Sequence, residues 1–297
     1  MTEFLTPIEW HYATKWEQMT ILDDPIFGAV MENERLCQEL LRRALPELKI
    51  DTVKLVERQH TIVGTLTSHA VRYDVYVRDN RQRNFAVEMQ IADQKNLPYR
   101  LRYYQDMMDT ELLRPGEDYR ALAKRPTYVI MFCAFDYYGQ GAARYEFGNV
   151  NLFDRRQEMG DGRKIVVFNS KAKHFEHASE IRTFLDFMEK RPNTEDSFIN
   201  DVQTTIELVK GNQERKWTYV KFEADLQYRL NQSREQGIQQ GEKQGQAKQQ
   251  AASATGIIKF LSAQGQSTQE IVANLAQMLN ISSEQAQRYY EQTMAHA

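Results

Sequence analysis

An aspartate and a glutamate with the spacing of a β-hairpin are the side chains of this chain best placed to do chemistry. Asp74 lies within a segment of alternating apolar residues, 71–78, and Glu88 lies within a second such segment, 84–91. Successive side chains of a strand point to opposite faces, so each segment would have one apolar face and one polar face. A five-residue loop at 79–83 would bring Asp74 directly opposite Glu88.

Two carboxylates that face each other across a hairpin repel, because like charges directly opposite are destabilising. They need a shared proton, a cation, or room to turn into water. A hard divalent ion suits them, since Mg²⁺ takes one or two carboxylates together with water and substrate phosphate. The alternative is a solvated polar face of an antiparallel sheet. The pair therefore predicts either a metal site or a solvent-facing strand.

Composition excludes several classes of protein. The chain has 297 residues, of which 41% are hydrophobic, and can bury a full core plus one appendage. Its two cysteines, Cys37 and Cys133, lie in apolar contexts and indicate a reducing compartment. The amino terminus is polar and does not resemble a signal peptide, and no apolar run approaches the roughly 18–20 residues that span a bilayer. We expect a soluble, cytoplasmic protein with no membrane partner.

Charge is distributed unevenly although the net charge is only −3. Arginines cluster at the tip of the predicted hairpin, and two more follow shortly after it: Arg78, Arg81 and Arg83, then Arg100 and Arg102. A basic patch beside a metal site could hold a phosphodiester backbone. Solvated charged loops are the alternative interpretation of the same residues.

The order of predicted elements favours an α/β core. Helical patterns cover Glu34–Leu45, which ends at Pro46, and a segment from Pro98 to about Leu113; Asp24-Pro25 resembles an N-cap followed by the first helical residue. The predicted strands are Thr52–Arg58, His60–Leu66, Val71–Arg78, Asn84–Ile91, Thr127–Phe135, Tyr145–Leu152 and Lys164–Phe168. The nearly all-apolar segment Thr127–Phe135 is typical of a central strand buried on both faces. Helices and strands that alternate in this way indicate a layered α/β fold.

The carboxy-terminal third is predicted to be helical from about His177. Gln232–Gln250 is rich in glutamine and contains three glycines at intervals of four: Gly237, Gly241 and Gly245. Such glycines would share one helical face and permit close helix–helix contact, or they would mark a flexible linker. We divide the chain into residues 1–231, a linker or helix at 232–252, and a small helical tail at 253–297.

The tail has two predicted helices with N-caps. Ser267 begins a capping-box pattern with Glu270, and Ser282 resembles a second cap. The two helices have the outline of a helix-turn-helix. The last one carries only Arg288 among basic residues, whereas a DNA-reading helix usually presents several. We therefore favour a protein-interaction element, suited to a homo-oligomer, over DNA readout.

The chain as a whole resembles the recombination-promoting nuclease family, also described as PD-(D/E)XK nuclease family transposases. The resemblance is carried by Asp24 with Phe27–Met31 and Leu40-Leu41, then Val71–Val77, Val87–Gln90, Arg102–Gln105 and Thr127–Asp136. It covers about residues 20–170, and the glycine-containing segment and helical tail are similar to that family's usual ending. The resemblance implies a restriction-endonuclease-like α/β core with a mixed central sheet, followed by a helical carboxy-terminal region.

The resemblance also implies roles for individual residues. Asp74 and Glu88 match the motif acids and would be metal ligands, with the main-chain carbonyl of Met89 as a third ligand. Gln90 matches the last motif position, which is usually lysine in the wider superfamily. Glutamine cannot act as a general base, so activation of water would fall to the Mg²⁺ or Mn²⁺ ion. On this interpretation, Gln90 orients water or phosphate, and Gln90→Lys is expected to keep or raise activity.

Other positions are assigned more loosely. The candidates for contacts to DNA phosphate are Arg72, Arg102 and Tyr104. A first-helix acidic residue often completes such sites, and Glu39 is the available candidate, although it points away from the apolar stripe of its helix. We do not assign it a role. His174 and His177 have an isolated spacing and are predicted to be surface residues.

The resemblance implies metal-dependent cleavage of DNA, with a link to recombination or mobile elements. The alternative, from a different class, is a catalytically weak DNA- or protein-binding module in which the motif survives only as structure. Fold resemblance does not decide between the two, because function depends on the site.

Overall fold

The computed structural model describes residues 5–58, 61–62 and 71–295. The chain divides into two compact units, Met1–Lys221 and Phe222–Ala297. The described strands and the motif residues Asp74, Glu88 and Gln90 all belong to the first unit. None of the helices in these residues combines the length and the apolar composition needed to cross a membrane.

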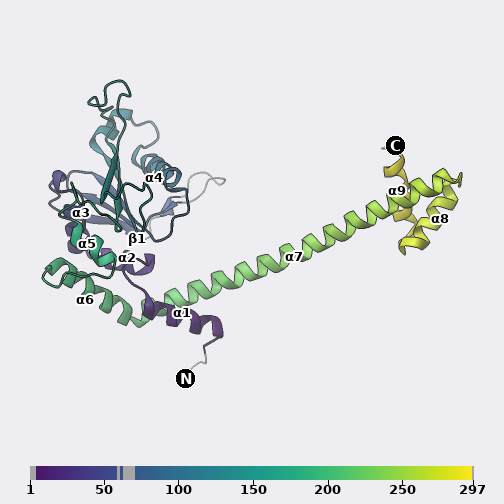
Figure 1. The fold of residues 1–297 in the computed structure, drawn as a ribbon, viewed down its shortest axis with the longest axis horizontal. Coiled ribbons are helices and arrows are strands. Elements are labelled where there is room, and N and C mark those ends of the chain that lie inside the picture. Colours follow the sequence, from purple (N-terminus) through teal and green to yellow (C-terminus); the bar gives the residue numbers. More distant parts are fainter. Residues whose placement is uncertain (1–4, 59–60, 63–70, 296–297) are drawn as a thin grey trace. The chain divides into compact units, whose positions relative to one another are not determined.

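A mixed sheet of six strands, counted over the described residues, forms the centre of the first unit (Figure 1). Its order is β1 (Val53–Arg58), β4 (Val75–Asp79), β5 (Asn84–Gln90), β6 (Thr127–Cys133), β8 (Arg163–Asn169) and β7 (Arg144–Phe147). The three central strands β5, β6 and β8 are parallel, and the outer pairs are antiparallel. The carboxyl ends of β5, β6 and β8 therefore meet at one edge of the sheet.

The predicted register of the hairpin is confirmed. Val75 pairs with Val87, and Arg78 pairs with Asn84. The first strand is shorter than predicted, because the chain bends at Tyr73-Asp74. Residues Val71–Arg72 form β3, which pairs with β2 (Thr61–Ile62) in a separate small sheet. Asp74 thus lies one residue before β4 rather than inside the strand, a correction to the predicted cross-strand pair.

The predicted polar face of β5 is wrong as a solvent-facing surface. Every residue of this strand is buried, and Glu88 is 0% exposed. The physical reason is that β5 is a central strand, with β4 on one side and β6 on the other, and helices cover both faces of the sheet. Buried charges are costly unless they are paired or bind a metal, so Glu88 is not one of the solvated side chains that the alternative interpretation expected.

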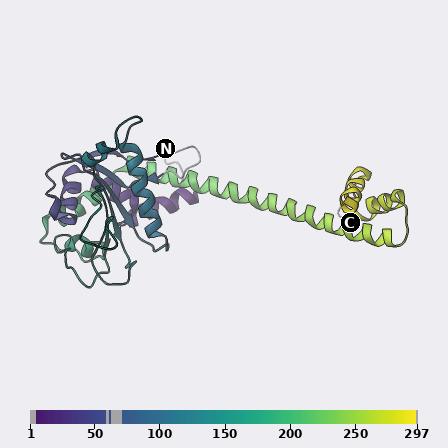
Figure 2. The ribbon, with the colours of Figure 1, turned by 90° about the horizontal axis from the view of Figure 1, so that it is seen from above.

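Helices cover the two faces of the sheet unequally, as Figures 1 and 2 show from perpendicular directions. One face packs against α4 (Leu97–Leu112). The other packs against α2 (Asp24–Met31), α3 (Glu34–Ala44), α5 (Arg182–Met188) and α6 (Ser197–Gly211). The remaining helical elements of this unit are α1 (Pro7–Gln18), the 3₁₀ turns η1 (Pro46–Leu48) and η2 (Tyr119–Lys124), and the start of α7 (Gln213–Ala263).

Alternation along β5 assigns each side chain to one of these faces. Val87 and Met89 belong to the core that includes Ile130 and Phe132 of β6. Ala86 belongs to the core beneath α4. Because strand side chains repeat every two residues, Glu88 and Gln90 share the face of Ala86. Both motif side chains are therefore directed toward α4.

Some predicted boundaries change. Helix α2 begins at Asp24, with Asp23 as the N-cap, so the predicted cap is one residue too late. The predicted strand Tyr145–Leu152 ends at Phe147, and the chain beyond it is exposed. Most of the predicted strand His60–Leu66 lies outside the described residues.

The carboxy-terminal residues are helical, as predicted. Of the two alternatives for 232–252, the structure has the helix, since α7 continues unbroken through this stretch for 51 residues in all. The capping box at Ser267 is present at the start of α8 (Thr268–Leu279), and Ser282 caps α9 (Ser283–Ala295). In the second unit, Ile258 of α7 packs with Ile271 and Leu275 of α8.

A buried ion pair joins α3 to the start of α6 and predicts acid sensitivity. Arg43 donates to Asp196 at 2.5 and 3.0 Å, and Thr183 donates to the same carboxylate at 2.6 Å. Burial would raise the pKa of Asp196, but the Arg43 and Thr183 hydrogen bonds outweigh it and lower the pKa to about 2. A lowered pKa contributes stability above the unfolded value of roughly 3.9, and this contribution is lost as the pH falls toward 2.

We expect Asp196→Asn to lower the free energy of unfolding at pH 6 by about 1–3 kcal/mol, because Arg43 loses its charged partner. The difference from the wild type should shrink between pH 4 and pH 3, measured by urea denaturation. Asp118→Asn, which breaks an exposed pair with Arg120, is the control and should change little. A wild-type advantage that stays constant from pH 6 to pH 3 would contradict the assignment.

Candidate metal site at the end of the central strands

The structure brings Asp74 and Glu88 together through the main chain. The Asp74 amide donates to Glu88 Oε1 at 3.0 Å, and the Met89 amide donates to Asp74 Oδ2, also at 3.0 Å. This reciprocal arrangement fixes one oxygen of each carboxylate at the carboxyl end of β5. The bend before β4 is what permits it, because Asp74 leaves the ladder and its side chain reaches the neighbouring strand.

The main-chain carbonyl of Met89 lies on the side of Asp74. Along a strand, the N–H and C=O of one residue point to the same side, and the Met89 N–H meets Asp74. The next carbonyl, of Gln90, points to β6, where it accepts from the Ala134 amide. The direction of the Met89 carbonyl is thus compatible with the predicted third ligand.

A third carboxylate, Asp24, approaches the pair from the first residue of α2. Its charge interacts with those of Asp74 and Glu88. Helix α2 lies close to this part of the sheet, because a Cβ atom added at Gly28 would lie 3.3 Å from the Asp74 carbonyl oxygen. Glycine at position 28 therefore allows α2 to approach. Asp24 is exposed, Asp74 is half-buried and Glu88 is fully buried, so the burial of the three carboxylates increases from the surface toward the core.

Burial raises the pKa values of all three acids, and repulsion by a neighbouring carboxylate adds to it. Burial is the largest cause for Asp74, followed by the charge of Asp24, and they raise its pKa to about 7. Burial and then the charge of Asp74 raise the pKa of Glu88 well above its ordinary value. For Asp24, burial of its inner side raises the pKa against the charges of Arg72 and Arg100. Burial is thus the main cause of all three shifts, and it disfavours the charged form of each acid.

Gln90 lies at the same site, and both ends of its side-chain amide make a hydrogen bond within the protein. Its Nε2 donates to the Ala92 carbonyl at 2.8 Å, and its Oε1 accepts from Arg100 of α4. Arg100 also donates to the hydroxyl of Tyr104 and lies 3.5 Å from Glu88 Oε2. Burial raises the pKa of Tyr104 to about 12, so the phenol stays neutral. The sequence places Arg100 only in a general basic patch and gives Asp24 only the role of a helix cap, and it assigns neither residue to this site.

The other predicted site residues lie at different distances from this cluster. Arg72 is exposed and interacts electrostatically with Asp24 and Asp74. Arg102 is exposed two residues beyond Arg100, about 200° further around the helix. Glu39 forms an ion pair with Arg43 at 2.9 Å and is not one of the clustered carboxylates. The histidines predicted at the surface, His174 and His177, are exposed.

Of the predicted basic patch, Arg100 lies beside the carboxylates, whereas the arginines of the hairpin tip do not. Arg78 and Arg83 flank the hairpin loop at the amino-terminal end of β5, whereas Glu88 and Gln90 lie at its other end. The strand separates these ends by roughly 20 Å at 3.3 Å per residue. Arg83 is buried and donates to Asp79 at 2.6 Å and to the Leu48 carbonyl at 2.8 Å, so it has a structural role. The arginines of the hairpin tip are not part of this site.

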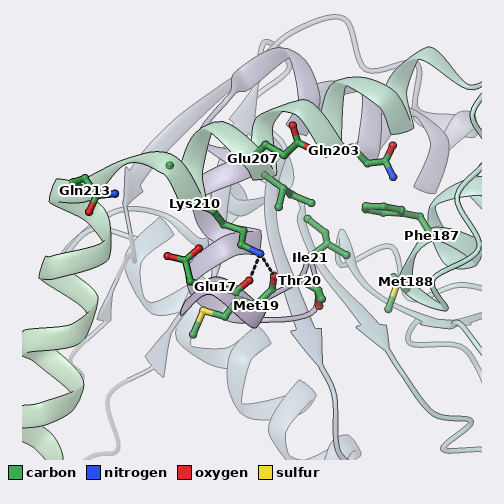
Figure 3. A pocket seen from close by; sticks show the side chains of 12 residues that line it. Glu17, Met19, Thr20, Ile21, Phe187, Met188, Gln203, Glu207, Lys210 and Gln213 are labelled. Atoms are coloured by element: carbon green, nitrogen blue, oxygen red, sulfur yellow. Dashed lines mark hydrogen bonds between the residues drawn. The ribbon is translucent and has the colours of Figure 1, made fainter. Parts of the chain in front are cut away.

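A pocket of 650 Å³ lies elsewhere in the first unit, between α5, α6 and the end of α1 (Figure 3). Lys210 crosses it and donates to the main-chain carbonyls of Glu17 and Met19, at 2.5 and 3.1 Å. Phe187 and Met188 line the opposite side. None of the predicted catalytic residues lines this pocket, and Lys210 serves to tie α6 to the end of α1.

The first unit has a mixed α/β sheet, and carboxylates cluster where its central strand β5 ends. These two features are those of an α/β protein with a candidate metal centre. The family model of the PD-(D/E)XK nuclease family transposases matches residues 25–234. This match covers more than half of the chain, and the chain belongs to that family. No curated protein and no solved structure matches the chain significantly. The predicted restriction-endonuclease-like fold with a helical carboxy-terminal region is confirmed.

Family membership supports a nuclease-like or transposase-like function, and such nucleases generally use divalent metal ions. The donors present fit such an ion. Glu88 Oε2 is buried without a hydrogen-bond partner, although carboxylate oxygens rarely remain so. In the described part of the chain, no three His, Cys, Asp or Glu side chains form a complete ligand set. Magnesium does not need one, because it keeps several waters and binds substrate phosphate.

Two signals in the sequence could have identified the residues that were missed. Asp23 and Asp24 are consecutive, and only one can be the cap; Asp23 takes that place and accepts from the Thr20 amide at 2.8 Å. Asp24 is then left free, four residues before a glycine that lets the helix approach. Arg100 follows Pro98 in the first turn of the next helix, where its side chain returns toward the strand that has just ended.

Proposed function

We propose that this protein is a metal-dependent DNA endonuclease that hydrolyses phosphodiester bonds with Mg²⁺ or Mn²⁺. One observation carries the proposal: in a member of a nuclease family, the buried Glu88 accepts from the Asp74 amide through Oε1, while its Oε2 accepts no hydrogen bond and has only the Arg100 guanidinium, 3.5 Å away, as an ionic neighbour. A link to recombination or to mobile elements is consistent with the transposase description of the family.

In this proposal, Asp74 and Glu88 hold the ion, with the carbonyl of Met89 directed to the same place. Asp24, at the mouth of the site, would hold a water of the ion rather than the ion itself. The ion, when bound, would polarise the scissile phosphate and lower the pKa of water beside it. The protein supplies geometry: two main-chain hydrogen bonds fix the carboxylates before DNA arrives.

DNA would be held by groups around the mouth of the site. Arg72 is exposed and close enough to the carboxylates to alter the pKa of Asp74. Arg102 lies on the exposed side of α4, suited to a phosphate farther along the backbone. Tyr104 acts through Arg100, to which its hydroxyl is hydrogen-bonded.

Purified protein and supercoiled plasmid test the proposal directly. We expect nicked circles with Mg²⁺ or Mn²⁺ and none with EDTA.

A second candidate function, a catalytically weak binding module, is favoured by the hydrogen bonds that both ends of the Gln90 amide make within the protein. Retarded plasmid without any nicking in either metal would establish the binding module instead.

We further propose that residues 1–231 form the catalytic part and that 253–297 mediates self-association. A side chain at Gly237, Gly241 or Gly245 would meet no atom within 4 Å, and Phe260 and Met278 of the second unit are exposed. A chain truncated after Asn231 should retain nicking and sediment as a smaller assembly than the full chain. Phe260→Glu should weaken association without removing the helices. Equal association states for full and truncated chains would refute the role of the tail.

A further inference from the structure

Arg100 is the one cation whose side chain contacts the motif residues among those described. It lies in the first turns of α4, and its side chain is 29% exposed. Its Nη1 donates to Gln90 Oε1, and its Nη2 lies 3.5 Å from Glu88 Oε2. The guanidinium is therefore close to the proposed metal ligands and still reachable from solvent.

Two neutral side chains hold this guanidinium in place. Tyr104 accepts hydrogen bonds from Nε at 3.0 Å and from Nη2 at 2.8 Å, and its ring lies 5.0 Å from the Arg100 Cζ atom. The main-chain carbonyl of Tyr104 accepts from the Tyr73 hydroxyl at 2.8 Å, which ties this turn of α4 to the sheet. Gln90 restrains the other side of the fork. Arg100 is thus preorganised rather than a mobile surface side chain.

The same contacts change the role of Gln90. One N–H of its Nε2 donates to the Ala92 carbonyl and its Oε1 accepts from Arg100, so the amide is held in one orientation and one of its acceptor positions is given to the guanidinium. A lysine at position 90 would place an ammonium beside the guanidinium. The contacts therefore lead to the opposite of the sequence-based expectation for Gln90→Lys: the single substitution should lower activity by like-charge repulsion.

The chemistry of guanidinium suits one task at this place. It stays protonated at any working pH and presents five donors in a planar fork that matches phosphate oxygens. The protein hydrogen bonds above use three of these N–H groups, which leaves donors on Nη1 and Nη2. A donor aimed at charge that develops on phosphate is worth more in a preorganised site than in water.

We propose that Arg100 is the catalytic cation of this site: it binds the scissile phosphate and stabilises its negative charge, while Gln90 and Tyr104 position it. This inference rests on the proposed endonuclease function. Arg100 gives and takes no proton in the reaction. Water adds to phosphorus and loses a proton to solvent, and the P–O bond breaks as its electron pair passes to the leaving oxygen, which takes a proton from solvent. The positive charge that a lysine at position 90 would supply comes here from the following helix.

The variants that test this proposal are expected to fold and to remove, retain or relocate the positive charge of Arg100. Arg100→Gln removes the charge, Arg100→Lys keeps it without the fork, and the double variant Gln90→Lys/Arg100→Gln transfers it to the strand. Arg120→Gln is the matched control, because Arg120 is 91% exposed and pairs with Asp118. Thermal unfolding verifies that each variant folds.

Three readouts are needed: the single-turnover nicking rate in Mg²⁺, the Kd for a short DNA duplex in Ca²⁺ by fluorescence anisotropy, and Mn²⁺ binding by calorimetry. Arg100→Gln should lower the nicking rate by about 100-fold, the cost of removing one preorganised donor. It should also weaken DNA binding relative to Arg120→Gln while Mn²⁺ still binds. Arg100→Lys should recover part of the rate, and the double variant should exceed Arg100→Gln alone.

The failures are distinguishable. If Arg100→Gln nicks as fast as the wild type and binds Mn²⁺ more tightly, Arg100 only neutralises the carboxylates and the inference is overturned. If the wild type itself does not nick, the endonuclease function fails, and anisotropy decides the inference. Weaker DNA binding by Arg100→Gln than by Arg120→Gln would then support phosphate binding, and equal binding would overturn it.

Discussion

Glu88→Gln and Asp74→Asn are each expected to reduce plasmid nicking by at least about 100-fold, since even the outer partners of metal ligands are worth about 10–100-fold. Glutamine at position 88 keeps the shape of the side chain, and its carbonyl can still accept from the Asp74 amide. What it removes is the negative charge of a buried carboxylate whose Oε2 accepts no hydrogen bond.

Both variants should fold as well as the wild type. Glu88 is a fully buried carboxylate whose pKa is raised by burial, so removal of its charge relieves a desolvation cost. Thermal unfolding should show an unchanged or higher Tm for Glu88→Gln. Glu146→Gln, on β7 of the same sheet and paired with Lys164, is the control and should nick normally. Unimpaired nicking by both motif variants would show that the assigned site is wrong.

Asp24→Ala is expected to produce the next largest loss, of about 10-fold or more, comparable with loss of an outer partner of a metal site. Asp24, at the start of α2, interacts electrostatically with both proposed ligands, Asp74 and Glu88. Because it repels Asp74, its removal should lower the pKa of Asp74 and should not reduce stability. The rate of nicking and the Tm would be measured on the same preparation.

The neighbouring aspartate offers a matched control. Asp23 is the N-cap residue of α2 without a side-chain capping bond, but its carboxylate accepts from the Thr20 amide, so Asp23→Ala should lower stability by about 0.5–1.5 kcal/mol. Its nicking rate at a temperature where it is folded should stay close to that of the wild type. If Asp23→Ala loses nicking and Asp24→Ala keeps it, the third carboxylate has been placed on the wrong residue.

The hairpin register could be predicted from sequence because it depends on local facts. The alternation of apolar residues and the length of the loop fix which residues pair, and Val75 does pair with Val87. What could not be predicted is the bend at Asp74, since it depends on the close approach of α2 at Gly28. The burial of Glu88 was equally hidden, because periodicity does not show that β6 and α4 enclose β5.

The members of the site that come from other elements were the least predictable. Asp24 had a sufficient local explanation as a cap, so nothing in its neighbours suggested a second role. Arg100 reaches Gln90 only because α4 returns across the face of the sheet that carries Glu88. Side chains contributed by packing, rather than by the strand itself, need the three-dimensional arrangement before they can be recognised.

Titration of Mn²⁺ into the metal-free protein tests the central claim most directly, because it does not depend on finding the right DNA. Calorimetry on the wild type should show saturable binding, with Glu88→Gln and Asp74→Asn each abolishing it or weakening it by at least about 10-fold. Glu146→Gln should bind like the wild type. Wild-type affinity in both motif variants, or no binding by the wild type, would contradict a metal centre at Asp74 and Glu88.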